Sequence, residues 1–209
     1  MIYDISPPIT SELKVWPGDP SLSRTVIPDR KRDRASTTSA FHATAHLGAH
    51  ADAPSHCGEG LPSIGECDLA AYMGPCQVIR LEVGRLTRIT PEALKTPPIA
   101  QRVLLATGTF PDPTEFNEDF AALTPELIEA LHRKGVKLVG IDTPSVDLFM
   151  DDALPAHHAA LTHNVAILEC LALDRVPEGL YELIALPLRL VGFDASPVRA
   201  ILRPPVPRA

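Results

Sequence analysis

Long apolar segments are missing from this sequence of 209 residues. No apolar run approaches the ~20 residues that a helix needs to cross a bilayer. The opening stretch, Met1-Ile2-Tyr3-Asp4-Ile5-Ser6-Pro7-Pro8, has neither the cationic segment nor the apolar segment of a secretory signal. We therefore expect a cytoplasmic protein that has no membrane partner.

Cysteine is scarce, and no two cysteines are spaced as Cys-x-x-Cys. The absence of that spacing excludes the common zinc-ribbon and dithiol motifs. In a reducing compartment the thiols are expected to stay reduced and to serve as packing groups. For Cys57 a contact with a metal is an alternative, because it lies next to a histidine-rich segment. The four cysteines are Cys57, Cys67, Cys76 and Cys170.

Positive charge is in deficit, with 19 Lys and Arg against 26 Asp and Glu and a formal net charge of −7. A surface of this sign does not attract nucleic acid or anionic lipid by bulk electrostatics. The basic run Arg30-Lys31-Arg32 is flanked by Asp29 and Asp33, and we interpret it as a solvated loop. Nucleic-acid binding is therefore not expected.

Proline, in contrast, is abundant, with 22 residues that lie mostly at the junctions of short apolar segments. Helix-start signals alternate with these segments, as in Thr124-Pro125-Glu126. The alternation predicts a single α/β domain over residues 1–209, with a mixed β-sheet packed against helices. Strands are expected at 2–5, 37–45, 76–81, 102–107, 136–141, 181–185 and 189–191, helices from 63, 90, 124 and 157, and either state at 165–170.

The densest chemical signal is the segment His46-Leu47-Gly48-Ala49-His50-Ala51-Asp52-Ala53-Pro54-Ser55-His56. Imidazole nitrogens and a carboxylate are ligands that suit zinc, manganese or iron(II). The glycine and the proline disfavour a helix, so we expect extended or looped backbone, on which His50 and Asp52 point to the same face. Polar groups buried among alanine and glycine need partners, and a metal would supply them. The segment predicts a metal site.

A second group of candidate ligands follows about a hundred residues later. It consists of His157, His158, His163 and Glu169. On residue chemistry alone the histidines are equally compatible with a solvated helix surface, and the glutamate with a helix end. By itself, this group does not predict a metal site.

At His46 to His56 the sequence resembles the cyclase family of metal-dependent hydrolases. The family signature is His-x-Gly-Thr-His-x-Asp-x-Pro-x-His, with Ala49 here in place of threonine. Within that family the resemblance is closer to the bacterial kynurenine formamidases, and it implies the family's swivelling β/β/α fold. The further stretches that carry it are Tyr3-Asp4-Ile5-Ser6-Pro7-Pro8, Val15-Trp16-Pro17-Gly18-Asp19, Tyr72-Met73-Gly74-Pro75-Cys76, Gly140-Ile141-Asp142-Thr143-Pro144-Ser145-Val146-Asp147, Ala166-Ile167-Leu168-Glu169 and Asp194-Ala195-Ser196-Pro197-Val198-Arg199.

The resemblance implies a role for each candidate residue. His46, His50 and Asp52 would hold one divalent metal. Asp52 would also bridge to a second metal, bound by a histidine and a glutamate twelve residues apart. That spacing selects His157 over His158 as the partner of Glu169. His56 would be the general acid and base, and Trp16 would line the substrate pocket.

The resemblance also implies two zinc ions per subunit, with manganese or iron as alternatives, and a homodimer. Residues 56–60 depart from the family pattern, because they lack the aromatic residue that often follows the last histidine of the motif. This departure concerns the shape of the pocket rather than the ligand set.

The implied activity is hydrolysis of N-formyl-L-kynurenine to L-kynurenine and formate in tryptophan degradation. One alternative is a hydrolase of the same family that acts on another amide, a lactone or a cyclic imide. Another is a metal- or ligand-binding protein that uses the fold without catalysis. A substrate panel separates the first two, and assays with and without a chelator separate both from the third.

Overall fold

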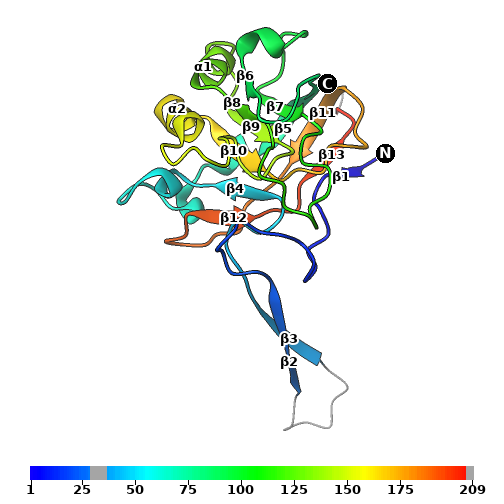
Figure 1. Ribbon diagram of the computed structural model, residues 1–209, viewed down its shortest axis with the longest axis vertical. Coiled ribbons are helices and arrows are strands. Elements are labelled where there is room, and N and C mark those ends of the chain that lie inside the picture. Colours follow the sequence, from blue (N-terminus) through cyan, green and yellow to red (C-terminus); the bar gives the residue numbers. More distant parts are fainter. Residues whose placement is uncertain (29–36, 206–209) are drawn as a thin grey trace.

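The structure is a computed structural model that describes residues 1–28 and 37–205. Among these residues, nine strands form one mixed, curled sheet in the order β1-β13-β11-β5-β7-β9-β10-β4-β12 (Figure 1). The strands are β1 (Tyr3–Asp4), β4 (His50–Asp52), β5 (Met73–Arg80), β7 (Arg102–Ala106), β9 (Leu138–Ile141), β10 (Ala166–Glu169), β11 (Gly179–Ile184), β12 (Ala195–Pro197) and β13 (Ile201–Arg203). The predicted α/β fold with a mixed sheet is confirmed. The run Arg30-Lys31-Arg32, for which we expected a loop, lies outside the described residues.

The middle of the sheet is parallel, and its flanks are antiparallel. β5, β7, β9 and β10 run parallel to one another, whereas β4 and β12 on one side and β11, β13 and β1 on the other pair antiparallel. Every residue of β7 and β9 is buried, as expected for central parallel strands formed by continuous apolar runs.

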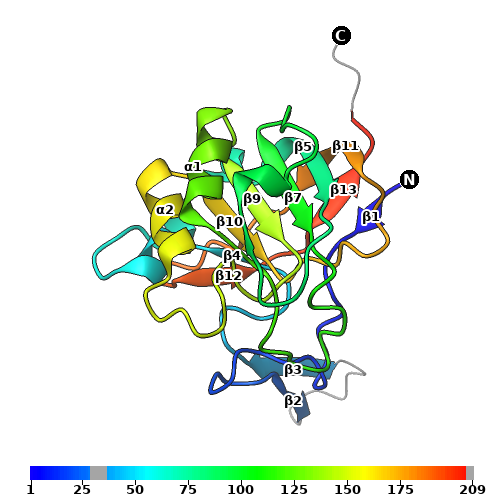
Figure 2. The same cartoon turned by 45° about the horizontal axis from the view of Figure 1, so that its top comes forward.

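Two packed helices, α1 (Pro125–Arg133) and α2 (Pro155–His163), cover one face of the sheet (Figure 2). The hydroxyl of Thr124 accepts a hydrogen bond from Leu127 N, and Pro125 occupies the first helical position, so α1 begins where the sequence predicts. Gly135, with a φ of 81°, follows the last turn. The helical signals at 63 and 90 form only the short 3₁₀ turns η2 (Ile64–Glu66) and η4 (Pro91–Ala93).

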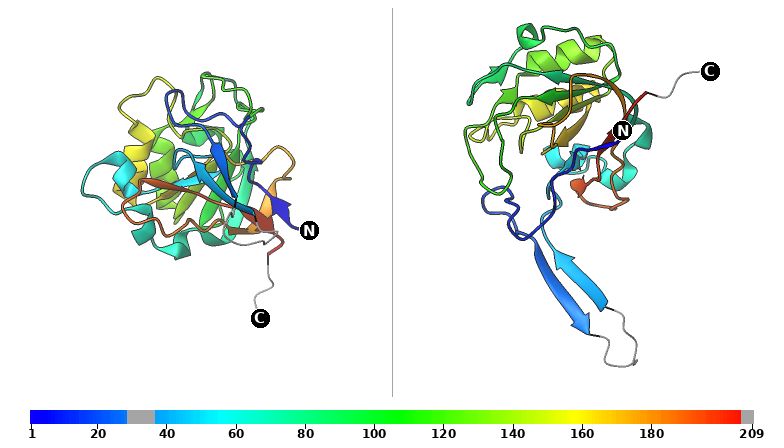
Figure 3. Two further views of the ribbon diagram at one scale, coloured as in Figure 1. Left: turned by 90° about the horizontal axis from the view of Figure 1, so that it is seen from below. Right: turned by 90° about the vertical axis from the view of Figure 1, so that its right-hand side faces the viewer.

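A two-stranded hairpin projects away from the rest of the molecule (Figures 1 and 3). It is formed by β2 (Ser23–Pro28) and β3 (Thr37–His42), which pair antiparallel in a sheet of their own. All of β3 is exposed, including 73% of Phe41. The expected strand at 37–45 therefore exists, but it ends four residues before His46. We call residues 23–28 and 37–42 the arm.

The prediction of a strand at 189–191 was wrong. The chain there forms no strand, and Val191 is 75% exposed. The sheet gains β12 and β13 instead, which are too short to give a periodic apolar signal. A further small sheet pairs β6 (Arg88–Ile89) with β8 (Ala122–Leu123). Within the described ranges, no helix combines the length and apolar character that crossing a membrane requires.

Candidate metal centre and active-site cavity

The register between β4 and β10 brings the two candidate ligand groups together. In this antiparallel pair Glu169 lies opposite His50, and Ile167 lies opposite Asp52. His50 and Asp52 are two residues apart on one strand, so their side chains share a face, as the sequence predicts. The imidazole of His50 places Nε2 3.2 Å from Glu169 Oε2 and 3.4 Å from Asp52 Oδ1.

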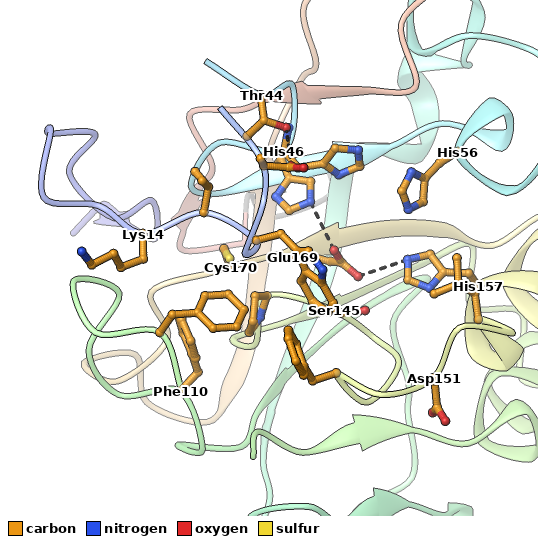
Figure 4. Close-up of a pocket in the computed structure, with 18 of the residues that line it drawn as sticks. Lys14, Thr44, His46, His56, Phe110, Ser145, Asp151, His157, Glu169 and Cys170 are labelled. Atoms are coloured by element: carbon orange, nitrogen blue, oxygen red, sulfur yellow. Dashed lines mark hydrogen bonds and ion pairs between the residues drawn. The ribbon is translucent and has the colours of Figure 1, made fainter. Parts of the chain in front are cut away.

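The helix α2 contributes His157 to the same cluster, next to Glu169 (Figure 4). Its Nε2 lies 3.4 Å from both Asp52 Oδ2 and Glu169 Oε1, and the residue is 2% exposed. His158 is exposed on the same helix and His163 is half-buried in its last turn. Of the two adjacent histidines, the fold thus brings His157 to the cluster and leaves His158 at the surface.

His46 completes the group from the loop that precedes β4. Its Nδ1 lies 3.1 Å from Asp52 Oδ1. Two sets of donor atoms result, one from His46, His50 and Asp52 and one from Asp52, His157 and Glu169. Within each set the atoms lie within 4.8 Å of one another. Asp52 belongs to both sets, which is the arrangement that a bridging carboxylate requires.

The chemistry of these atoms fits a divalent cation. Four of them, His50 Nε2, His157 Nε2 and both carboxylate oxygens of Asp52, are buried without any hydrogen-bond partner. Leaving even one buried polar group unpaired costs about 1–3 kcal/mol. Nitrogen and carboxylate donors that face one another in this way suit zinc, manganese or iron.

Each histidine of the cluster is oriented by an acceptor on its other ring nitrogen. The carbonyl of Gly48 lies 2.8 Å from His50 Nδ1, and Asp147 Oδ2 lies 2.7 Å from His157 Nδ1. Because a carbonyl oxygen can only accept, Nδ1 of His50 carries the hydrogen and Nε2 remains free for a cation. Asp194 Oδ2 lies 3.3 Å from His46 Nε2 in the same way. Such outer contacts fix ring orientation and raise ligand basicity.

Asp147 has a second task at the start of α2. Its carboxylate accepts hydrogen bonds from the backbone N–H groups of Ala156 and His157, so it holds the first turn of the helix as well as the imidazole. The sequence alone assigned no role to Asp147 or Asp194, although both lie in stretches that carry the family resemblance. No spacing pattern connects them to the histidines, because the contacts are made between distant segments.

The carboxylates of the cluster favour positive charge on the neighbouring imidazoles. Burial alone would raise the pKa of Asp52, but the neighbouring imidazoles of His157 and His46 hold it well below its usual range. Burial would lower the pKa of His46, yet Asp194 and Asp52 raise it to about 10. The carboxylates thus favour positive charge at these donor atoms, and a cation that binds there would compete with protons.

His56 lies beside the cluster on η1 (Pro54–Cys57) and is half-buried. Its ring centroid is 4.5 Å from that of His46 and 5.4 Å from that of His157, and its Nδ1 is 3.6 Å from Asp194 Oδ2. It belongs to neither of the two donor sets that contain Asp52. A third set joins it with His46 and Asp194. Its assignment as the acid and base, rather than as a ligand, therefore stays a prediction.

A cavity of about 460 Å³ opens over these groups (Figure 4). Its floor includes His46, His50, His56, His157 and Glu169. Trp16 lines this cavity, and its ring centroid lies 4.9 Å from that of Phe149; its contact with a substrate stays a prediction. Further aromatic residues of this wall come from separate loops, so no sequence pattern indicated them; they are Phe110, Phe116 and Phe149.

The thiols take no part in the donor sets found among the described residues. All four cysteines are free. Burial raises the pKa of the Cys57 thiol, which disfavours the thiolate that a metal would need. A metal contact through Cys57 therefore has no support in the geometry.

Comparison with known proteins relates the chain to one family, whose model covers the histidine-rich motif. Residues 3–148 match the family model Cyclase, described as “Putative cyclase”. The chain belongs to the cyclase family, as its motif predicts. The matched range contains His46 to His56 but ends before His157 and Glu169, so the second donor set rests on the structure and not on that match.

Three individual proteins illustrate what the chain is similar to within and around this family. A kynurenine formamidase of Bordetella petrii is 43% identical over 205 residues, which cover 97% of each chain. Among solved structures, one titled a potential metal-dependent hydrolase with cyclase activity has a TM-score of 0.83 and 30% identity, covering 97% of this chain and 96% of its own. Isatin hydrolase A from Labrenzia aggregata has a TM-score of 0.82 and 25% identity, covering 97% and 93%.

Proposed function

We propose that this protein hydrolyses N-formyl-L-kynurenine to L-kynurenine and formate, as a step of tryptophan degradation. The observation that carries the proposal is the set of unpaired buried donor atoms at the floor of a cavity with an aromatic wall. The 43% identity to a kynurenine formamidase over nearly the whole chain supports the choice of substrate.

The proposal includes two divalent metal ions, with zinc preferred and manganese or iron as alternatives. One would be held by His46, His50 and Asp52, and the other by Asp52, His157 and Glu169. Bound there, such ions would polarise a carbonyl group and lower the pKa of water, two properties that a neutral formamide needs for hydrolysis near pH 7.

The protein's own residues would orient the substrate and move a proton. The rings of Trp16 and Phe149 would contact the aniline ring of the substrate. Water adds its oxygen to the formyl carbon, the bond from that carbon to the anilide nitrogen breaks, and the nitrogen leaves with a proton. His56, whose ring stands next to the donor sets, would take the proton from water and deliver it to that nitrogen.

Formate release tests the proposal directly. Purified protein supplied with zinc should release formate from N-formyl-L-kynurenine, and a chelator should abolish the release by removing the ions. Added zinc or manganese should then restore it. Unchanged turnover in protein shown by elemental analysis to be free of metal would rule out the metal-dependent route.

A cyclic amide is the competing substrate class, and the likeness to isatin hydrolase A favours it over a lactone. The same assay should therefore include isatin, with a lactone for comparison. If kcat/KM is higher for isatin than for N-formyl-L-kynurenine, isatin replaces N-formyl-L-kynurenine as the proposed substrate. Metal binding without turnover of any substrate in the panel would instead favour a binding protein.

We also propose that the protein is a homodimer in which the arm contacts the partner. The arm exposes apolar side chains that the body leaves uncovered, with 51% of Val26, 48% of Ile27 and 73% of Phe41 accessible. Exposed apolar surface of this kind commonly marks an interface. We expect light scattering to give the dimer mass, and Phe41→Asp to shift it toward the monomer.

The matched control for the arm is Ile99→Asp, because Ile99 is 71% exposed but lies on the body. This variant should remain dimeric. A monomeric mass for the active wild-type protein would refute the dimer. A dimer that persists in Phe41→Asp would place the interface elsewhere.

Two further parts of the proposal concern the whole chain. We treat residues 1–209 as a single domain, since one sheet receives strands from both ends of the described chain. A cytoplasmic location is consistent with four free cysteines, because a reducing compartment keeps thiols in that state.

A further inference from the structure

Ser145 places a buried hydroxyl in the cavity wall, outside the donor sets and apart from His56. It is 5% exposed and lines the cavity. The next residue, Val146, donates its backbone N–H to Glu169 Oε1 at 2.7 Å, which ties this segment to one of the candidate metal ligands. Figure 4 shows Ser145 next to Glu169. The position of the hydroxyl relative to the donor sets is therefore fixed.

The hydrogen bonds around Ser145 leave its O–H available. Its Oγ accepts a hydrogen bond from Asp147 N at 3.0 Å, and its backbone carbonyl accepts one from the Thr143 hydroxyl at 2.7 Å. No acceptor for the Ser145 O–H occurs in the part of the chain that the structure describes. A serine hydroxyl offers one donor, so this donor remains for a molecule in the cavity.

Hydroxyl groups are few among the described residues that line the cavity. The hydroxyl of Thr44, which also lines the cavity, already donates to Asp19 Oδ2 at 2.8 Å. Carboxylates are numerous in the wall and, when ionised, can only accept hydrogen bonds. They include Asp19, Asp151, Asp152, Glu169 and Asp194. A carbonyl oxygen of a substrate would need a donor here, and the carboxylates would repel it.

The substrate of the proposed function has such an oxygen. N-formylkynurenine carries a ketone on the ring carbon next to the one that bears the formamide, so the two groups project from the same edge of the ring. With the formyl group over the donor sets, the ketone oxygen would lie beside them as well. We propose that the Ser145 hydroxyl donates a hydrogen bond to this ketone oxygen and thereby selects formanilides with an ortho acyl group. This inference rests on the proposed function.

The test compares two substrates in the metal-loaded enzyme. N-formyl-L-kynurenine has the ortho ketone, whereas formanilide lacks it, and both use the same donor sets. We expect Ser145→Ala to lower kcat/KM for N-formyl-L-kynurenine about tenfold, as for loss of one good hydrogen bond, and to leave formanilide nearly unchanged. Ser145→Thr keeps the hydroxyl and should retain the preference.

The substrate pair also separates recognition from structure. Ser145→Ala removes the acceptor for Asp147 N, and a displaced Asp147 would disturb His157. Such a defect would lower turnover of both substrates equally and reduce metal content, and either result would overturn the inference. Equal kcat/KM of wild type and Ser145→Ala toward N-formyl-L-kynurenine would also overturn it. If the wild type hydrolyses neither substrate, the proposed function itself fails and the inference fails with it.

Discussion

Asp52→Asn is expected to lose both metal ions and, with them, about a thousandfold or more of the hydrolytic activity. Asp52 is the residue common to both donor sets, and both of its carboxylate oxygens are buried without a hydrogen-bond partner. Asparagine has nearly the same size, but it replaces one carboxylate oxygen with an amide nitrogen that cannot bind a cation, and its remaining oxygen carries no charge. Elemental analysis of the purified variant should therefore find less than one ion per chain.

Asp174→Asn is the matched control for this variant. Asp174 is exposed and pairs only with its neighbour Arg175 among the described ion pairs, so this substitution should leave metal content and activity unchanged. Full metal occupancy in Asp52→Asn would contradict the bridging role. Loss of one ion alone would assign Asp52 to a single donor set.

The sequence predicted the donor set that is local in the chain. His50 and Asp52 fall on one face of β4 because side chains alternate along a strand, and this rule needs no tertiary information. The apolar runs that form β7 and β9 were equally predictable, since central parallel strands are apolar on both faces. Local chemistry and periodicity thus account for the first half of the site and the middle of the sheet.

The rest of the site depends on contacts that no local pattern encodes. Glu169 reaches His50 through the register of β10 against β4, and residue chemistry alone does not distinguish it from a helix end. Asp147, Asp194 and the phenylalanines of the cavity wall come from loops, where sequence carries little periodicity. Short strands such as β12 escaped prediction for the same reason, because three residues cannot show a period.

The exposed arm shows a different limit of sequence reasoning. A strand at 37–45 was expected from composition, but composition did not show that β3 leaves the main sheet and exposes both faces. Threonine and phenylalanine favour strands in a buried sheet and in an exposed hairpin alike, so their presence does not predict burial. In the described structure every residue of β3 is exposed. If the arm contacts a second subunit, the apolar residues of the hairpin have an ordinary explanation.

His56→Ala is expected to keep both metal ions and to lose about 100- to 10,000-fold in kcat. His56 stands outside the two donor sets that share Asp52, yet its ring is within 5.4 Å of His157 by centroid distance. Its proposed task is to protonate the anilide nitrogen as the C–N bond breaks, because an anilide anion is too basic to leave unaided. His158→Ala, which removes an exposed histidine from α2, should leave kcat unchanged.

A change of leaving group isolates this proton transfer. A nitrophenyl formate ester expels a phenolate that needs no proton, so His56→Ala should lose much less activity toward the ester than toward N-formyl-L-kynurenine. Equal losses on both substrates would contradict the role of His56 as an acid. Loss of metal from His56→Ala would point instead to the third donor set, in which His56 joins His46 and Asp194. Activity toward the amide, activity toward the ester and metal content can each change without the others. Together they distinguish a proton carrier from a metal ligand at position 56.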